Sequence, residues 1–91
     1  MYLVQKSGHY LHEAIGLYER LDVAIAFAAE AIGKERDTYH QYKIYSVVPE
    51  KVVEYLYPCC VVSCMENGKI YVDKFVGYEL QSSTVYVKEE L

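Results

Sequence analysis

The sequence lacks most features that would assign it to a large functional class. No stretch approaches the roughly 20 apolar residues that a bilayer-spanning helix requires, and no apolar signal-type segment follows Met1. The net charge of −4 is mild and has the wrong sign for a general nucleic-acid binder. We therefore expect a cytoplasmic globular protein that neither associates with membranes nor binds nucleic acid unspecifically.

Catalytic signatures are missing as well. The sequence contains no glycine-rich phosphate loop and none of the patterns His-Glu-x-x-His, Gly-x-Ser-x-Gly or Cys-x-x-Cys. Its 91 residues fit a single domain, 1–91, which leaves little room for a deep pocket. These absences favour a non-enzymatic protein without a cofactor.

Tyrosine is abundant where other aromatic residues are scarce, with 11 Tyr, 2 Phe and no Trp. A tyrosine side chain joins a large apolar ring to a polar tip, which suits a half-buried sheet face or a contact surface. Both uses remain open from composition alone.

The first half of the chain predicts two strands, a helix and a further strand. Ile25, Ala28, Ala29 and Ile32 recur at helical spacing after a candidate N-cap, Asp22. Gly16, within the second strand, suggests a bulge or a close backbone approach. The predicted elements are strands at 2–6, 13–19 and 41–48 and a helix at 23–36.

The second half predicts β-hairpins. Residues 50–57 fit either a short helix or a strand, because Pro49 suits both a helix start and a strand end. Asn67-Gly68 indicates a two-residue turn between apolar strands, the second of them at 69–78, and residues 83–88 give the last strand. The resulting fold class is α+β, a ββαβ start followed by C-terminal hairpins. Its antiparallel or mixed sheet of five or six strands carries one long helix on one face.

All three cysteines fall within six positions of the hairpin's first arm. A two-residue turn pairs Cys64 with Tyr71 and Cys60 with Phe75, and directs these four side chains away from the core. Cys60 and Cys64 would lie about 13 Å apart at ~3.3 Å per residue, too far for a shared metal or a disulfide. We expect free thiols and a contact surface made of Cys60, Cys64, Tyr71 and Phe75.

The three histidines lie in two loops that a strand–helix–strand crossover would bring to one end of the molecule. Imidazoles, tyrosines and cations there could hold a phosphate, a base or an acidic protein surface, although loop residues are often polar simply because loops are hydrated. A zinc site formed by His9, His12 and His40 is a weak alternative, and we expect no metal. The candidate ligand- or partner-binding residues are His9, Tyr10, His12, Lys34, Arg36, Tyr39, His40 and Tyr42.

Residues 1–50 show a pattern that resembles small uncharacterised phage and bacterial domains. The matching positions are Ile15, Gly16, Tyr18, Ala24, Ala28, Tyr42 and Ile44, in an Ile-Gly-x-Tyr strand, an alanine-rich helix and a Tyr-x-Ile strand. The turn after Tyr18 departs from the Ser-Ser of that pattern. The resemblance implies a ββαβ start and a phage origin, and no functional residues come with it.

Three functions follow as hypotheses. The first is a small non-enzymatic binding protein, a phage accessory protein in the host cytoplasm, that inhibits or modulates a host protein such as a defence protein by direct contact, either alone or as a homodimer. The second is a protein that binds and sequesters a nucleotide or another phosphorylated small ligand at the histidine loops. The third is a small histidine-dependent nuclease or hydrolase that uses His12 or His40.

Overall fold

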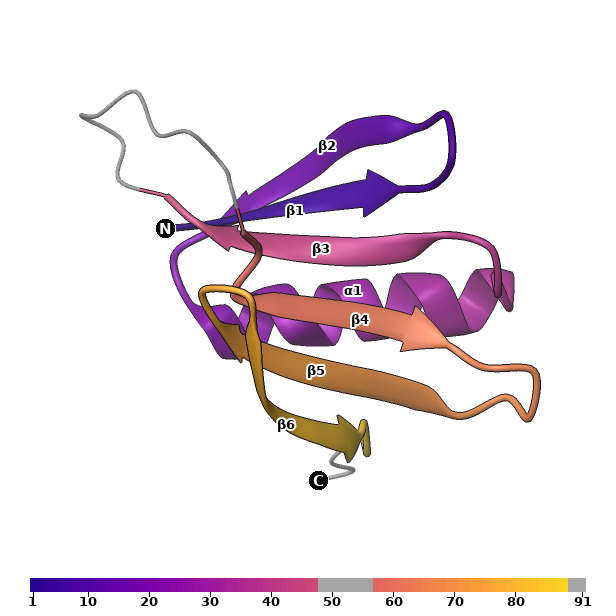
Figure 1. Ribbon diagram of the computed structural model, residues 1–91. Helices are drawn as coiled ribbons and strands as arrows, with labels where there is room; N and C mark the ends of the chain where they lie inside the picture. Colours follow the sequence, from indigo (N-terminus) through magenta and orange to yellow (C-terminus); the bar gives the residue numbers. More distant parts are fainter. Residues whose placement is uncertain (48–56, 89–91) are drawn as a thin grey trace.

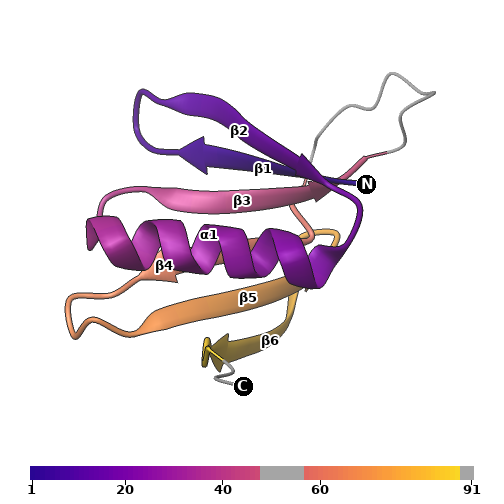
Figure 2. The same cartoon turned by 180° about the vertical axis from the view of Figure 1, so that it is seen from behind.

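The computed structural model describes residues 1–47 and 57–88, which form one antiparallel sheet and one helix. The strands follow the order β2-β1-β3-β4-β5-β6, and α1 packs on one face of the sheet (Figures 1 and 2). This arrangement confirms the predicted α+β class. The elements are β1 (Tyr2–Ser7), β2 (His12–Tyr18), α1 (Leu21–Glu35), β3 (Gln41–Ser46), β4 (Cys60–Cys64), β5 (Ile70–Val76) and β6 (Glu79–Val85).

The helix begins and ends slightly earlier than predicted. Its N-cap is Arg20, whereas the predicted cap, Asp22, lies in the first turn and pairs with the Arg20 guanidinium at 2.6 Å. A carboxylate there still suits the positive end of the helix dipole. The helix ends at Glu35, and Arg36 is its C-cap. The Arg36 N–H bonds the Gly33 carbonyl, and the left-handed φ of 50° at Arg36 lets the next N–H, that of Asp37, bond the Ile32 carbonyl.

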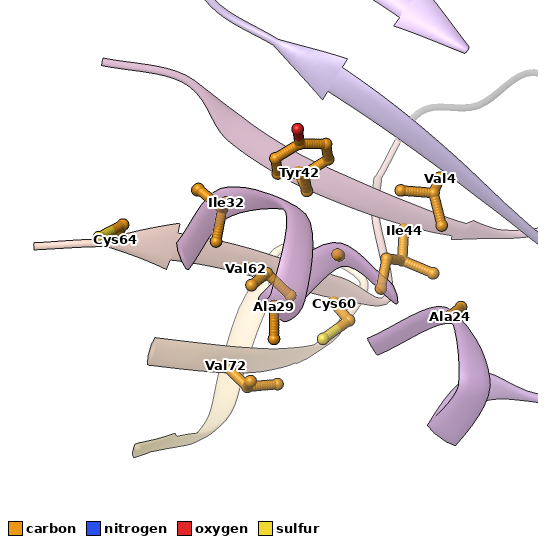
Figure 3. Packing of buried hydrophobic residues seen from close by; sticks show 11 residues of the cluster. Val4, Ala24, Ala29, Ile32, Tyr42, Ile44, Cys60, Val62, Cys64 and Val72 are labelled. Carbon is orange, nitrogen blue, oxygen red and sulfur yellow. The ribbon is translucent and has the colours of Figure 1, made fainter. Parts of the chain in front are cut away.

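Small side chains let the helix lie close to the sheet. Ala24, Ala28, Ala29 and Ile32 are buried, and Gly33 passes so near β5 that an added Cβ would lie 2.7 Å from Ile70 Cδ1. The predicted apolar face is therefore largely confirmed, although Ile25 is only partly buried. The sheet side of this core is formed by Val4, Tyr42, Ile44, Cys60, Val62, Cys64 and Val72 (Figure 3).

The prediction for Gly16 is confirmed. The β1–β2 pairing shifts register between Val4 and Gln5, directly beside the Val4–Gly16 pair. The Tyr18 ring lies over Gly16, where a Cβ would come within 2.6 Å of it. A larger residue would push this ring out of its contact with Phe27 on α1.

The turn between β4 and β5 corrects the predicted register. A two-residue Asn-Gly turn needs a positive φ at both positions, but Arg36 is the only non-glycine residue with positive φ in the described parts of the chain. The Gly68 N–H bonds the Met65 carbonyl, and the Met65 N–H bonds the Lys69 carbonyl. The loop thus has three residues, 66–68, with Gly68 (φ 82°) as its left-handed member.

One extra loop residue moves every pair in the hairpin by one position. Cys64 pairs with Ile70, Val62 with Val72 and Cys60 with Lys74. A one-residue change reverses the faces of a strand, so Cys60 (0 % exposed) and Cys64 (5 %) lie under α1 instead of facing away from it. The predicted surface of Cys60, Cys64, Tyr71 and Phe75 is therefore not formed. Of these four residues, only Tyr71 and Phe75 lie on the side of the sheet opposite α1.

The final strand also begins earlier than predicted. The predicted strand at 69–78 is too long at its C-terminal end, because Gly77 (φ 61°) turns the chain after Val76. β6 therefore covers Glu79–Val85. The sequence leaves residues 50–57 open to either a helix or a strand. All of them except Tyr57 lie outside the described residues.

All three cysteines carry free thiols, as expected. Among the described residues, no helix has both the length and the apolar character needed to cross a bilayer.

The corrected register predicts that Cys60 resists alkylation in the folded protein. Burial, followed by the neighbouring Cys59 thiol, raises the pKa of Cys60 to about 12, so little reactive thiolate forms near neutral pH. Treatment with iodoacetamide at pH 8 followed by mass spectrometry should leave this thiol unmodified. In urea all three cysteines should react. Rapid labelling of Cys60 in the native state would contradict this assignment of faces.

Candidate functional site

Both histidine loops meet at one end of the sheet, as the crossover argument predicted. The β1–β2 loop, the C-terminus of α1 and the start of β3 all lie at the same end (Figure 1). Gly8 packs directly against the His40 ring, and an added Cβ at Gly8 would lie 3.0 Å from Nε2. We call residues 7–12 and 34–41 the histidine end.

Asp37 organises the second of these loops. Its Oδ1 accepts the backbone N–H groups of Tyr39 and His40 at 2.9 and 3.0 Å, and its Oδ2 contacts His40 Nδ1 at 2.6 Å. Burial alone would raise the pKa of this carboxyl, but the hydrogen bonds from His40 and Tyr39 outweigh that effect and lower it. The pair fixes the imidazole so that its Nε2 edge faces Gly8.

A second polar group links this loop to the sheet and the helix. Lys6 Nζ lies 2.9 Å from Glu35 and 3.8 Å from Asp37. The hydrogen bond to Glu35 is the largest cause of a raised Lys6 pKa, and it outweighs the lowering effect of burial. The Tyr42 hydroxyl donates a long bond of 3.5 Å to Glu35, while its ring is 2 % exposed and belongs to the core.

The remaining histidines have separate surroundings. His12 Nδ1 lies 3.2 Å from the buried Ser7 hydroxyl, and the His9 ring stands edge-on to Tyr10 with centroids 5.4 Å apart. Within 1–47 and 57–88, no three His, Cys, Asp or Glu side chains gather closely enough to hold a metal ion. The three-histidine zinc site is therefore not assembled by the described residues.

The exposed part of the histidine end carries two almost fully solvated rings. Tyr10 is 96 % exposed and Tyr39 is 90 % exposed, one on each loop. Lys34 and Arg36 are also exposed, at the end of α1. Seven of the eight predicted binding residues thus lie at or near the surface of this end. The eighth, Tyr42, is buried in the core.

A groove of about 310 Å³ runs between the two loops and the end of β4. Gly8, His9, Tyr39, His40, Ser63 and Cys64 contribute to its lining. A second hollow of about 560 Å³ adjoins it between Arg36 and the β4–β5 turn, and the two share Thr38, Cys64 and Met65. Together they form a shallow, polar surface with imidazole, hydroxyl and guanidinium groups on its borders.

Sequence reasoning missed the residues that hold this surface in place. Asp37 and the Lys6–Glu35 pair are not among the predicted site residues, yet they connect β1, α1 and the His40 loop. A local signal could have predicted the role of Asp37, because an Asp side chain in a turn commonly accepts the backbone N–H of the residue two positions later. The Lys6–Glu35 pair joins residues 29 positions apart and has no local signal.

No family model, curated protein or solved structure matches this chain. The function must therefore be argued from the chain's own geometry.

The lowered pKa of Asp37 predicts a specific loss of stability in acid. A carboxyl whose folded-state pKa is below its ordinary value stabilises the fold at higher pH, and this contribution disappears as the pH falls through the folded-state pKa, below about pH 4. Asp37→Asn should therefore show a smaller decrease in unfolding free energy between pH 7 and pH 3 than the wild type.

Urea unfolding at the two pH values measures this difference. Asp22→Asn is the matched control, because that carboxylate is exposed and pairs only with Arg20 in the described structure. An equal pH dependence for wild type and Asp37→Asn would contradict the role given to Asp37.

Proposed function

We propose that this protein is a small non-enzymatic binding protein whose histidine end contacts another protein. The observation that carries the proposal is the pair of exposed rings, Tyr10 and Tyr39, on two loops that the fold brings together. Leaving large rings in water forgoes the stabilisation that burial would give them. Tyrosine is also among the residues that dominate binding energy at protein interfaces.

Rigid support favours binding over simple loop hydration. Asp37 fixes the Tyr39–His40 segment through two backbone bonds, and Gly8 packs on the His40 ring. A loop already held in one conformation loses less entropy when it binds. The groove between the two loops, which Tyr39 and His40 help to line, offers a place for one protruding side chain of the partner.

Charge indicates what kind of surface the partner presents. The acidic groups Glu35 and Asp37 are already engaged by Lys6 and His40, whereas Lys34 and Arg36 form no ion pair within the described structure. An acidic patch on the partner would complement these two cations. In keeping with the resemblance to phage domains, we propose that the partner is a host protein whose activity is inhibited or modulated by this contact.

A second candidate function rests on the groove itself. Its volume of about 310 Å³ lies at the lower end of the range for small-ligand sites, and His9, His40 and Tyr39 are suitable groups for a phosphate or a base. A nucleotide or another phosphorylated small molecule is therefore the alternative ligand for the same surface.

Removing the two rings should abolish partner binding. Tyr10→Ala/Tyr39→Ala is expected to lose, in pull-downs from a bacterial lysate, the protein that the wild type retains. Tyr57→Ala/Tyr78→Ala is the matched control, because those rings are 55 % and 78 % exposed and contact each other at the opposite end of the sheet. Recovery of the same protein by both double variants, or of none by the wild type, would reject the proposal.

A thermal shift assay separates the two candidates. Protein–protein binding predicts no rise in melting temperature with a panel of nucleotides and sugar phosphates at about 1 mM, whereas a ligand bound to the native state must raise it. A rise that disappears in His9→Ala/His40→Ala would replace the leading proposal with the second. Circular dichroism of that variant confirms that it is folded.

A further inference from the structure

The groove between the histidine loops continues over the end of the sheet. A third hollow, of about 630 Å³, shares Tyr39 with that groove and Glu66 with the hollow near Arg36. Cys64 and Met65 line all three. In Figure 1 the β1–β2 loop, the α1–β3 loop and the β4–β5 turn follow one another along this end. We call the three hollows together the end groove.

The length of the end groove suits an extended chain. The groove begins at Gly8, directly after β1, and reaches Ile70, the first residue of β5. Three strand spacings separate β1 from β5, through β3 and β4, so the groove is about 14 Å long at ~4.8 Å per spacing. Five residues of an extended peptide cover about 13 Å between the first and the last Cα. A single protruding side chain would fill only part of this length.

Two cations lie toward opposite ends of the end groove. Lys43 lines the hollow between the histidine loops, and Arg36 lines the hollow beside the β4–β5 turn. Neither forms an ion pair within the described structure. The imidazoles of His9 and His40 line the groove together with Lys43. On a chain whose net charge is −4, this local positive charge favours an acidic ligand.

The middle of the end groove offers an apolar contact and disfavours negative charge. Met65 lines all three hollows and is 47 % exposed. Its flexible thioether side chain can adapt to an apolar group of a partner. Glu66, the next residue, is the one carboxylate among the described residues that line the groove. Because it would repel a second carboxylate, the central residue of a ligand should be apolar.

We infer that the end groove binds an extended acidic segment of the partner protein, with the pattern acidic-x-apolar-x-acidic. Side chains two residues apart lie on the same side of an extended chain. The two acidic side chains would therefore face Lys43 and Arg36, and the apolar side chain between them would contact Met65. The inference rests on the proposed function, because it states which kind of segment the partner presents to the histidine end.

Two peptides of identical composition test the pattern. Fluorescein-labelled Gly-Asp-Ser-Leu-Ser-Asp-Gly has the predicted spacing, whereas Gly-Ser-Asp-Leu-Asp-Ser-Gly carries both carboxylates beside the leucine. In fluorescence anisotropy titrations with the full chain at low salt, the first peptide should bind with a dissociation constant below about 1 mM. The second should bind at least about tenfold more weakly, because its carboxylates would lie near Glu66 and away from the two cations.

Charge exchange identifies the two contacts. Lys43→Glu and Arg36→Glu should each weaken binding of the first peptide about tenfold or more, because a like charge would then face one of its carboxylates. The double variant Lys43→Glu/Arg36→Glu should instead bind Gly-Lys-Ser-Leu-Ser-Lys-Gly, which also shows that it is folded. Lys74→Glu is the matched control and should bind the first peptide as the wild type does. Lys74 is exposed, forms no ion pair within the described structure and does not line the end groove.

The outcomes separate this inference from the proposed function. The inference is overturned if the wild type does not bind the first peptide, if it binds both peptides equally, or if the two single variants bind as the wild type does. Should one of these results occur while Tyr10→Ala/Tyr39→Ala still loses the partner in the pull-down, the proposed function stands without the acidic segment. A wild type that binds the first peptide but retains no lysate protein would reject the proposed function alone.

Discussion

Gly68 closes a three-residue turn, and the register of that turn decides which side of the central strand meets the helix. With this register, Cys60, Val62 and Cys64 lie beneath the alanines of α1, and the helix can pack at short distance. The same constraint directs Val61, Ser63 and Asp73 to the side of the sheet opposite α1. A shift of one residue would turn Cys60, Val62 and Cys64 away from α1 and place the Ser63 hydroxyl beneath the apolar helix.

The histidine end depends on the edge half of the sheet, where Lys6, Glu35 and Asp37 join β1, α1 and the His40 loop. Gly8 packs on the His40 ring and so brings the β1–β2 loop against this group. The surface therefore consists of exposed rings on loops that hydrogen bonds and ion pairs hold in place.

Local signals predicted much of the fold. The helical spacing of alanine and isoleucine predicted the helix, and alternating residues predicted five of the six strands. The strand–helix–strand crossover predicted that the two histidine loops lie at one end. The errors arose where one signal permits two geometries. Asn67-Gly68 suits both a two-residue and a three-residue turn, and a glycine such as Gly77 can lie within a strand or, with a positive φ, end it. At the site, the exposed tyrosines were predicted, whereas the Lys6–Glu35 pair was not, because its partners are distant in sequence.

The face assignment of β4 is the claim on which the core depends, and cross-strand proton contacts test it most directly. In the nuclear Overhauser spectrum of the folded protein, the Hα of Val62 should show a strong contact with the Hα of Val72, and Cys64 with Ile70, since these residues are directly opposite each other. Contacts of Val62 with Asp73 and of Cys64 with Tyr71 in their place would show the two-residue turn and contradict the account.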